Sequence, residues 1–378
     1  MTLIAKSSLV RHITTDYKRF AAKYHQVSRL KLLAIIFITS VFVELLLLNL
    51  WKTLNRPAQS TNLEAPRESV LKQIPLPLSS TPSPEPTDNE KKIPQLIFGM
   101  GSEADGAEKT NLVREAPVKM LTSWYNGPSD LEWMTGWKNN LVPRLYSEGY
   151  TLHLIVFTEK PEGEVATSAG PACGREYPVS TRILDDMKKL ATTFAGEGRL
   201  YVTLFTEFQT YPCEDNKWVG SENYYKALKA NYYSIKDIFH QHAPNARVGI
   251  SWGGWQSRWD DVEGGGGRSL IPYFADLMKD SDIVAFQAME SGSNVDDIRN
   301  MTHILGTYGK PVILSHYKPD NRSQDTFDAD MRSVLTQDYL NDLTSHGLIA
   351  LSFMDSDNMD QDAKIYQFIK SAIIKYAK

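Results

Sequence analysis

The sequence lacks the short motifs that mark several large classes of protein. It holds no phosphate-binding loop, because the run EGGGG at residues 263–267 has neither the Lys-Ser/Thr pair nor the preceding strand that such a loop requires. No His-x-x-x-His or Cys-x-x-Cys pair indicates zinc. The acidic residues 355–360 lack the glycine and the terminal glutamate of a calcium-binding loop. We therefore expect no metal and no cofactor.

After the first 31 residues, acidic residues outnumber basic ones. Residues 1–31 carry seven Lys or Arg and one acid, Asp16, for a formal charge of +6, whereas the whole chain carries −4. The rest of the chain is therefore mildly acidic, at −10. This balance gives no indication of a nucleic-acid partner.

One apolar run is long enough to cross a bilayer. Residues 32–51, within KLLAIIFITSVFVELLLLNLW, are almost unbroken in apolar character and could span a hydrocarbon core of roughly 30 Å as a helix. The basic residues before the run place the N-terminus in the cytoplasm. A cleaved signal peptide, the alternative, would have a shorter core and a small-residue cleavage site. We predict an uncleaved signal anchor, held by the lipid bilayer, with the C-terminal part extracytoplasmic, in a periplasm, at a cell surface or in a secretory lumen.

Proline is concentrated in the segment that follows. Residues 56–94 hold eight prolines among Ser, Thr, Glu and Lys, a composition that cannot bury a core and favours an extended chain. We therefore divide the chain into a cytoplasmic tail, a transmembrane anchor, a linker and one outer domain, at residues 1–31, 32–51, 52–92 and 93–378.

Eight short apolar runs recur in the outer domain, each followed by a polar loop and most by a helix-like stretch. They are QLIFGMG at 95, VKMLTSWY at 118, TLHLIVFTE at 151, LYVTLFTEF at 200, RVGISWGGW at 247, DIVAFQAME at 282, KPVILSHY at 310 and LIALSFMDSD at 348. Runs that are apolar throughout and alternate with helices indicate a parallel sheet covered on both faces. Eight units favour a single (β/α)8 barrel, with an open doubly wound sheet as the alternative.

Apolar residues at three- and four-residue spacing predict the helices between these runs. The predicted helical segments are 129–146, which opens with a Ser-x-x-Glu capping box, 181–198, 224–242 and 296–310. Residues 102–117, after the first run, hold little that indicates a helix.

Aromatic and polar residues gather where the predicted strands end, which is where a barrel of this kind builds its functional rim. Aromatic faces suit the apolar faces of sugar rings, and amide or carboxylate groups suit hydroxyls. The residues that we predict to contact a glycan are Trp124, Tyr125, Tyr211, Trp252, Trp255, Gln287, His316 and Tyr317. The alternative is that the aromatic residues only pack the barrel and its helices.

Glu207 ends the run LYVTLFTE, between Phe205 and Phe208. Burial beside two rings would raise the pKa of the Glu207 carboxyl and keep its proton near neutral pH. Hydrolysis of a glycosidic bond typically needs such an acid together with an ionised carboxylate. We predict that Glu207 is the general acid/base of a glycoside hydrolase that acts on a polysaccharide.

Two longer stretches carry a family resemblance. ILDDMKKLATTFAGEGRLYVTLFTEFQTYPC and NYYKALKANYYSIKDIFHQHAPNARVGISWGGW resemble strands 3 to 5 of clan A glycoside hydrolases, most nearly the family 26 β-mannanase-like endoglycanases. GKPVILSHY is similar to their strand 7 and GLIALSFMDSDN to their strand 8. The resemblance covers most of the outer domain as a pattern, with few specific motif matches. It implies a (β/α)8 barrel in which Glu207, on strand 4, is the acid/base.

The chain departs from that family at its second carboxylate. His316 stands where the family has a nucleophilic glutamate at the end of strand 7. We predict that Glu290, after strand 6, supplies the missing group, with Asp355 or Asp357, after strand 8, as alternatives. A wider separation of the two carboxyl groups would leave room for a water molecule and predict inversion. Thr206 is a smaller departure, because the family has His or Asn before the acid.

Three other interpretations stay open. The barrel could bind a glycan beside a membrane-embedded polysaccharide synthesis or export machine without cleaving it. His316 could be a base in elimination or group transfer. The outer domain could also be a membrane-tethered interaction module.

The only two cysteines lie in the outer domain. Cys173 and Cys213 follow neighbouring predicted strands, so a disulfide between them would fix the loops beside Glu207 if the compartment is oxidising. Two free thiols are the alternative.

Overall fold

The computed structural model describes residues 93–378, except for 158–161, 211–217, 261–268 and 290. The predicted tail, anchor and linker lie outside these residues and stay predictions. Within the described part of the chain, no helix combines the length and the apolar character needed to cross a membrane.

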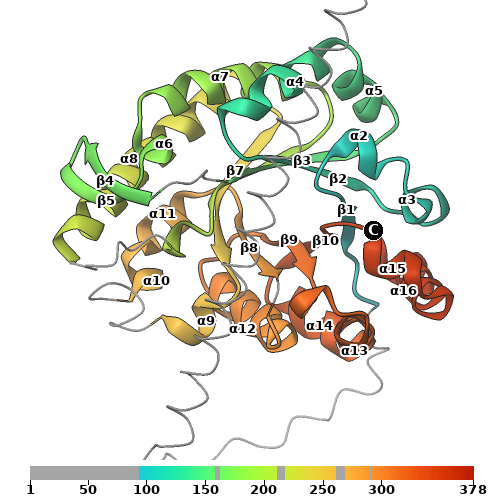
Figure 1. Cartoon of the computed structure of the whole chain (residues 1–378). Coiled ribbons are helices and arrows are strands. Elements are labelled where there is room, and N and C mark those ends of the chain that lie inside the picture. Colours follow the sequence, from blue (N-terminus) through green and yellow to red (C-terminus); the bar gives the residue numbers. More distant parts are fainter. Residues whose placement is uncertain (1–92, 158–161, 211–217, 261–268, 290) are drawn as a thin grey trace, which may run out of the picture. The chain divides into compact units, whose positions relative to one another are not determined.

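Eight parallel strands close into a barrel (Figure 1). The order around the barrel is β1-β10-β9-β8-β7-β6-β3-β2, and β1 and β10 close the seam. The strands are β1 (Ile97–Met100), β2 (Met120–Tyr125), β3 (Thr151–Phe157), β6 (Leu200–Thr206), β7 (Ala246–Gly253), β8 (Val284–Met289), β9 (Val312–Lys318) and β10 (Leu348–Phe353). Each lies within one of the eight predicted runs or extends beyond it by one residue at one end. The barrel prediction is confirmed, and the open sheet is not formed.

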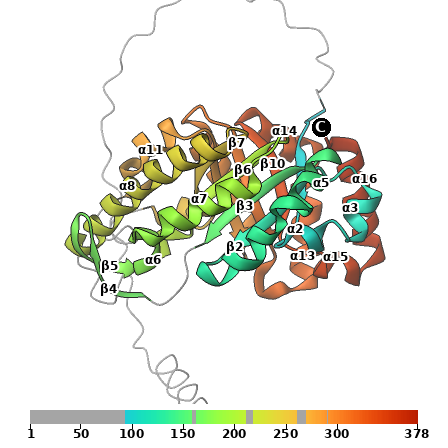
Figure 2. The same ribbon diagram turned by 90° about the horizontal axis from the view of Figure 1, so that it is seen from above.

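Helices surround the barrel; α7 and α8 run side by side (Figure 2), and α8 lies against β7. The α-helices are α2 (Ala104–Ala107), α3 (Asn111–Glu115), α4 (Leu131–Thr135), α5 (Leu141–Ser147), α6 (Glu176–Val179), α7 (Arg182–Phe194), α8 (Trp218–His242), α9 (Gln256–Trp259), α10 (Leu270–Tyr273), α11 (Ala275–Asp280), α12 (Asn294–Gly306), α13 (Gln324–Val334), α14 (Gln337–Ser345), α15 (Asp357–Gln361) and α16 (Ala363–Tyr376). Short 3₁₀ turns occupy Pro128–Asp130, Gly136–Asn139, Phe208–Thr210 and Asp320–Arg322.

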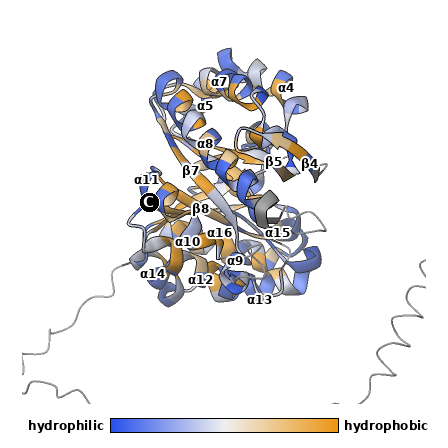
Figure 3. Cartoon of the chain, turned by 90° about the vertical axis from the view of Figure 1, so that its left-hand side faces the viewer, coloured by the Kyte–Doolittle hydropathy of each residue, from blue (hydrophilic) through white to orange (hydrophobic). Residues whose placement is uncertain are grey.

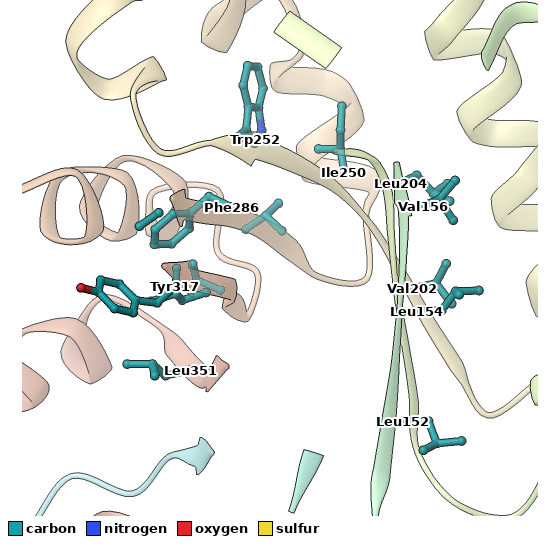
Figure 4. Close-up of a cluster of buried hydrophobic side chains, with 14 of the residues drawn as sticks. Leu152, Leu154, Val156, Val202, Leu204, Ile250, Trp252, Phe286, Tyr317 and Leu351 are labelled. Atoms are coloured by element: carbon teal, nitrogen blue, oxygen red, sulfur yellow. The ribbon is translucent and has the colours of Figure 1, made fainter. Parts of the chain in front are cut away.

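Successive side chains along each strand point alternately outward, toward the helices, and inward, toward the barrel axis. The outward set packs against the helices; Figure 4 shows Leu152, Leu154 and Val156 of β3 pointing away from the barrel. In Figure 3, much of β7 and β8 is orange or pale, while the helices around them carry both blue and orange residues. Because both faces of each strand are covered, the strands read as continuous apolar runs.

The inward set is layered along the barrel axis. Where the strands begin, six buried residues form a small apolar cluster: Met120, Tyr201, Ile283, Ala285, Ile313 and Ala350. Above it lies a buried hydrogen-bonded chain, in which Thr122 contacts Ser352 (3.2 Å) and His153 (3.5 Å) and His153 contacts Thr203 (3.0 Å). The interior therefore changes from apolar to polar toward the strand ends.

Two local predictions were wrong. The single helix predicted over 129–146 is divided into α4 and α5 with 3₁₀ turns between and before them, and Ser129 does not cap it. Pro143 allows only a helix that restarts shortly before it, because its ring would clash with the carbonyl four residues back. Residues 162–175, predicted as loop, form an antiparallel hairpin of β4 (Glu162–Thr167) and β5 (Gly170–Arg175).

Candidate active site

Glu207 directly follows β6 and adopts a strained backbone conformation. Its φ is 61° and that of Phe205 is 58°, in the left-handed region that non-glycine residues rarely occupy. The side-chain amide of Gln287, on β8, donates a hydrogen bond to Glu207 Oε1. Strain of this kind costs of order 1–3 kcal/mol and is concentrated at functional sites. The strain and the hydrogen bond together fix the carboxyl at the strand-end face of the barrel.

Trp124 and His316 form a second unit of the site, between β2 and β9. Trp124 Nε1 donates to His316 Nδ1 (2.6 Å), and the two rings are stacked with centroids 5.4 Å apart. His316 Nε2 lies 2.6 Å from the carbonyl oxygen of Gly101, just after β1. Since Nδ1 accepts, Nε2 must carry the proton, so the contacts define one neutral tautomer.

His316 is therefore a structural residue. It is fully buried, and burial lowers its pKa to about 3. Both ring nitrogens are engaged by Trp124 and Gly101. Its lowered pKa and its two engaged nitrogens disfavour base chemistry on His316, and its substrate contact stays a prediction.

The strand-end face also holds an ion pair. Lys318, the last residue of β9, donates from Nζ to Asp355 Oδ2 at 2.6 Å. The Lys318 side chain is only 7% exposed and that of Asp355 is 28% exposed. Asp357, two residues on, is exposed at the start of α15. Of the two acids that follow β10, Asp355 is thus the one that pairs with a buried residue.

Two adjacent strands turn buried polar side chains toward the upper barrel interior, and a third strand carries a buried hydroxyl. Ser251 pairs in register with the inward-facing Ala285, and Gln287 lies two residues beyond Ala285 on β8. Ser315 of β9 lies at a register shift, between Leu314, which pairs with Phe286, and His316, which pairs with Gln287. The hydroxyls of Ser251 and Ser315 and the Oε1 atom of Gln287 have no hydrogen-bond partner among the described residues. Buried polar atoms normally find a partner, so this region is suited to water or ligand hydroxyls.

Three residues predicted to contact a glycan point outward instead. The hydroxyl of Tyr125 contacts that of Tyr177 at 2.6 Å in the helical layer. Trp252 packs edge-on against Phe208 and Phe274. Tyr317 donates to Asp330 of α13 at 2.7 Å. All three are buried, so for them the packing alternative holds.

The aromatic contacts of Phe208 bear on Glu207 as well. Phe208 lies in the outward cluster with Tyr225, Trp252 and Phe274. Its ring is therefore committed to the helical layer, rather than to the carboxyl as the sequence interpretation assumed.

Other predicted residues are described in part or not at all. Trp255 is half-buried after β7, with its ring over Gly253, where an added Cβ would lie 2.4 Å away. Tyr211 and Glu290 lie outside the described residues, so their roles stay predictions. Cys173 lies in β5, and no described cysteine is free, but Cys213 is also outside the described residues. The pairing of the two cysteines therefore stays a prediction too.

Sequence reasoning missed two residues beside Trp124. Phe157, at the end of β3, lies 5.5 Å from Trp124 between ring centroids, and the guanidinium of Arg175 lies 5.1 Å above the Phe157 ring. Arg175 is only 2% exposed. Its place in β5 could not be foreseen without the hairpin. Phe157 lies within the predicted run that starts at 151 and could have been included, and Lys318 directly follows the predicted run that starts at 310.

Comparisons with known proteins give structural neighbours only. No family model matches the chain, and no curated protein matches it. The glycoside hydrolase domain of PgaB (BpsB) from Bordetella bronchiseptica is 11% identical, with 76% of this chain and 100% of that chain covered and a TM-score of 0.43. A fungal β-1,4-galactanase is 15% identical, with 70% and 90% covered and a TM-score of 0.43. A thermostable mutant of a xylanase (Xyn10A) from Cellvibrio japonicus is 11% identical, with 74% of this chain and 98% of that chain covered and a TM-score of 0.43. At such low similarity, any functional assignment has to rest on the site itself.

Proposed function

We propose that the outer domain is a glycoside hydrolase acting on a polysaccharide, with Glu207 as general acid/base. The observation that supports this most strongly is the strained Glu207, hydrogen-bonded by Gln287 at the strand-end face of a (β/α)8 barrel. The barrel also carries the partly buried ring of Trp124 and the buried hydroxyls of Ser251 and Ser315, which have no hydrogen-bond partner among the residues that the structure describes. Such groups suit the apolar and the hydroxylated faces of a sugar.

In the proposed reaction, protonated Glu207 gives its proton to the glycosidic oxygen as the bond from that oxygen to the anomeric carbon breaks. A water molecule attacks the anomeric carbon, and a second carboxylate takes the proton that the water loses. The hydrogen bond from Gln287 keeps the Glu207 carboxyl in a fixed orientation for this transfer.

We assign the second carboxylate to Asp355. It lies on the same face as Glu207, and the ion pair with Lys318 fixes its position. Glu290 is the competing candidate from the sequence, and Asp357 is disfavoured because it is exposed. An inverting outcome remains part of the proposal, since a water molecule acts between the two groups.

The test uses the purified full chain on a panel of β-linked polysaccharides, with release of new reducing ends as the readout. We expect Glu207→Gln and Asp355→Asn each to lower the rate about 10²–10⁴-fold, the range for a lost general acid or base. Asp357→Asn is the matched control and should retain the rate. The melting temperature of each variant checks that it is folded.

Each result decides one assignment. Full activity in Glu207→Gln would refute the hydrolase mechanism. If Asp355→Asn is fully active and Glu290→Gln loses most of its activity, Glu290 is the carboxylate that takes the proton from water. NMR of the first product anomer would show whether the configuration is inverted.

A glycan-binding barrel is the second candidate, and His316 favours it. The position that would carry a nucleophile in the resembled family holds a buried neutral imidazole committed to two protein partners. Saturable binding of a polysaccharide without new reducing ends in the unmodified chain would support this function, with a glycan synthesis or export machine as the expected partner.

Membrane attachment through residues 32–51 is a separate proposal, based on the apolar run and the basic tail. We expect the full chain to stay with membranes at alkaline pH and a chain lacking residues 1–51 to be released. A Cys173 to Cys213 disulfide is proposed with it, and peptide mass spectrometry without reduction would detect the linked pair.

A further inference from the structure

A cluster of three potential metal ligands lies at the opposite end of the barrel from the candidate active site. His303 Nε2 is 3.0 Å from Asp342 Oδ1, and His346 Nδ1 is 3.3 Å from the same oxygen. The two imidazoles are stacked, with centroids 3.8 Å apart. The three ligand atoms all lie within 4.8 Å of one another.

The fold brings these residues together through two helix ends. His303 lies in the last turn of α12, whereas Asp342 and His346 lie at the end of α14, four residues apart on one helix face. Gly306 permits the close approach, because a Cβ there would lie 2.2 Å from the carbonyl oxygen of His346. The strands β9 and β10 begin just after these ends, so the cluster is fixed to the base of the barrel.

The position of Asp342 calls for a nearby cation. A carboxylate in the last turn of a helix faces the negative end of the helix dipole, which is unfavourable unless positive charge lies beside it. Arg299 approaches Asp342 Oδ2 at 3.4 Å, but its guanidinium also lies 4.7 Å from the Tyr339 ring centroid. Arg299 can therefore stay on Tyr339 while another cation takes the carboxylate.

We propose that His303, Asp342 and His346 bind one zinc ion, or a similar divalent transition metal. At metal–ligand distances of about 2.0–2.1 Å, tetrahedral ligand atoms lie about 3.4 Å apart, close to the separations of the two imidazole nitrogens from Asp342 Oδ1. Because a metal lies in the plane of each imidazole that binds it, the stacked rings, whose planes differ by 27°, must turn apart on binding. Two imidazoles and one carboxylate are ligands that zinc prefers. Binding at Nδ1 of His346 displaces the proton that it shares with the carbonyl oxygen of Asp342, 2.9 Å away.

The cluster is accessible to an ion from solution. The side chains of His303, Asp342 and His346 are 38%, 32% and 43% exposed. A hollow lined in part by His303, Gly306, Ser345 and His346 opens beside them. With three protein ligands, the fourth coordination position is left to water. A bound ion would link α12 to α14 and stabilise the base of the barrel.

The test is zinc titration of the metal-free full chain by calorimetry, with Co²⁺ absorption as an optical probe. We expect one site per chain and a higher melting temperature with zinc. His303→Ala, Asp342→Asn and His346→Ala should each weaken binding at least tenfold, because each removes one ligand. His240→Ala is the matched control: it breaks another surface His–carboxylate pair, with Asp282 at 2.7 Å, that lacks a second imidazole.

A second measurement does not depend on how the variants fold. Zinc should protect His303 and His346 of the unmodified chain from acylation by diethyl pyrocarbonate, while His240 stays reactive, as mapped by mass spectrometry. Absence of a saturable site, equal weakening by His240→Ala, or unprotected His303 and His346 would each overturn the proposal.

Discussion

The two ends of the barrel interior differ in polarity, packing and backbone strain. Where the strands begin, the inward residues are apolar and closely packed, as in the cluster around Met120 and Ile313. Where they end, polar residues such as Gln287 face inward, backbone strain occurs at Glu207, and the buried hydroxyl of Ser251 has no partner within the described part of the chain. The first end is packed as a stable core requires, whereas the second holds a strained backbone and buried polar groups, both of which cost stability.

This difference teaches where stability and chemistry reside in the molecule. Close packing at the strand-start end lowers the free energy of the folded chain. Strain and unpaired polar groups at the strand-end face raise it, which is the pattern expected of a site kept for function. Each of the following variants or conditions should therefore change activity and stability to very different extents.

The largest expected effect is on activity alone. Glu207→Gly should lower the proposed hydrolysis by about 10³-fold, because the proton donor is lost. The melting temperature should stay equal or rise, because glycine adopts a φ of 61° without strain. Asn321→Gly is the matched control, since Asn321 has a φ of 49° in an exposed turn. It should leave activity unchanged. A marked loss of stability in Glu207→Gly would mean that the site is not strained.

A cavity at the strand-start end should have the opposite effect. Ile313→Ala is expected to lower the free energy of unfolding by about 2–5 kcal/mol in urea titrations, because Ile313 is fully buried among apolar neighbours. The folded fraction should keep its catalytic rate. Ile374→Ala, at a position 57% exposed, should change stability little. If Ile313→Ala and Ile374→Ala lower the free energy of unfolding by similar amounts, the strand-start cluster is not a stabilising core and the prediction is wrong.

Acid should weaken the fold through its two interior histidines. Burial lowers the pKa of His153 and of His316 from 6.5 to about 3. The unfolded chain therefore binds protons below pH 6.5 that the folded chain does not, so stability is complete above pH 6.5 and is lost as the pH falls toward 3. Each imidazole should cost about 2 kcal/mol between pH 7 and pH 5.

Urea unfolding at the two pH values measures this loss. His316→Gln should reduce the pH dependence by about half. An unchanged slope in His316→Gln would show that His316 binds protons equally in the folded and the unfolded chain.

The smallest expected effect concerns the unit of Trp124 and His316. Trp124→Phe keeps an aromatic ring but removes the donor to His316 Nδ1, so stability should fall by about 1–3 kcal/mol. Trp133→Phe is the control, because Trp133 is exposed and donates only at 3.4 Å to Asp130. Equal stability in both variants would show that the hydrogen bond from Trp124 to His316 contributes no net free energy to folding.

The sequence was sufficient for the barrel but not for the hairpin. Each barrel strand is buried on both faces, so each appears as a continuous apolar run such as that of β3. β5, with the sequence GPACGR, has neither a continuous run nor clear alternation, and only its pairing with β4 makes it a strand. Pro143 was a readable signal of the break between α4 and α5, and it was overlooked.

At the site, the residue types indicated which residues gather at the strand ends, but the sequence did not show which way each side chain points. Trp124 and Tyr125 are adjacent in β2, so they cannot face the same way, and only the register shows that Tyr125 faces the helices. The neutral state of His316 depends on Gly101 and Trp124, which are distant in sequence. The metal ligand cluster was invisible to a search for paired histidines, because His303 belongs to a different helix from His346.

The hydrogen bond from His316 to Gly101 has a consequence for the order in which the chain acquires its structure. It joins residues 215 positions apart, across the seam where β1 meets β10. While the chain is being made, the edge of β1 stays unpaired on that side until residue 353 has emerged. Contacts of such long range form slowly, so an incomplete barrel exposes apolar strand edges to aggregation. Truncation near the C-terminus should therefore yield insoluble chains, rather than a smaller folded domain.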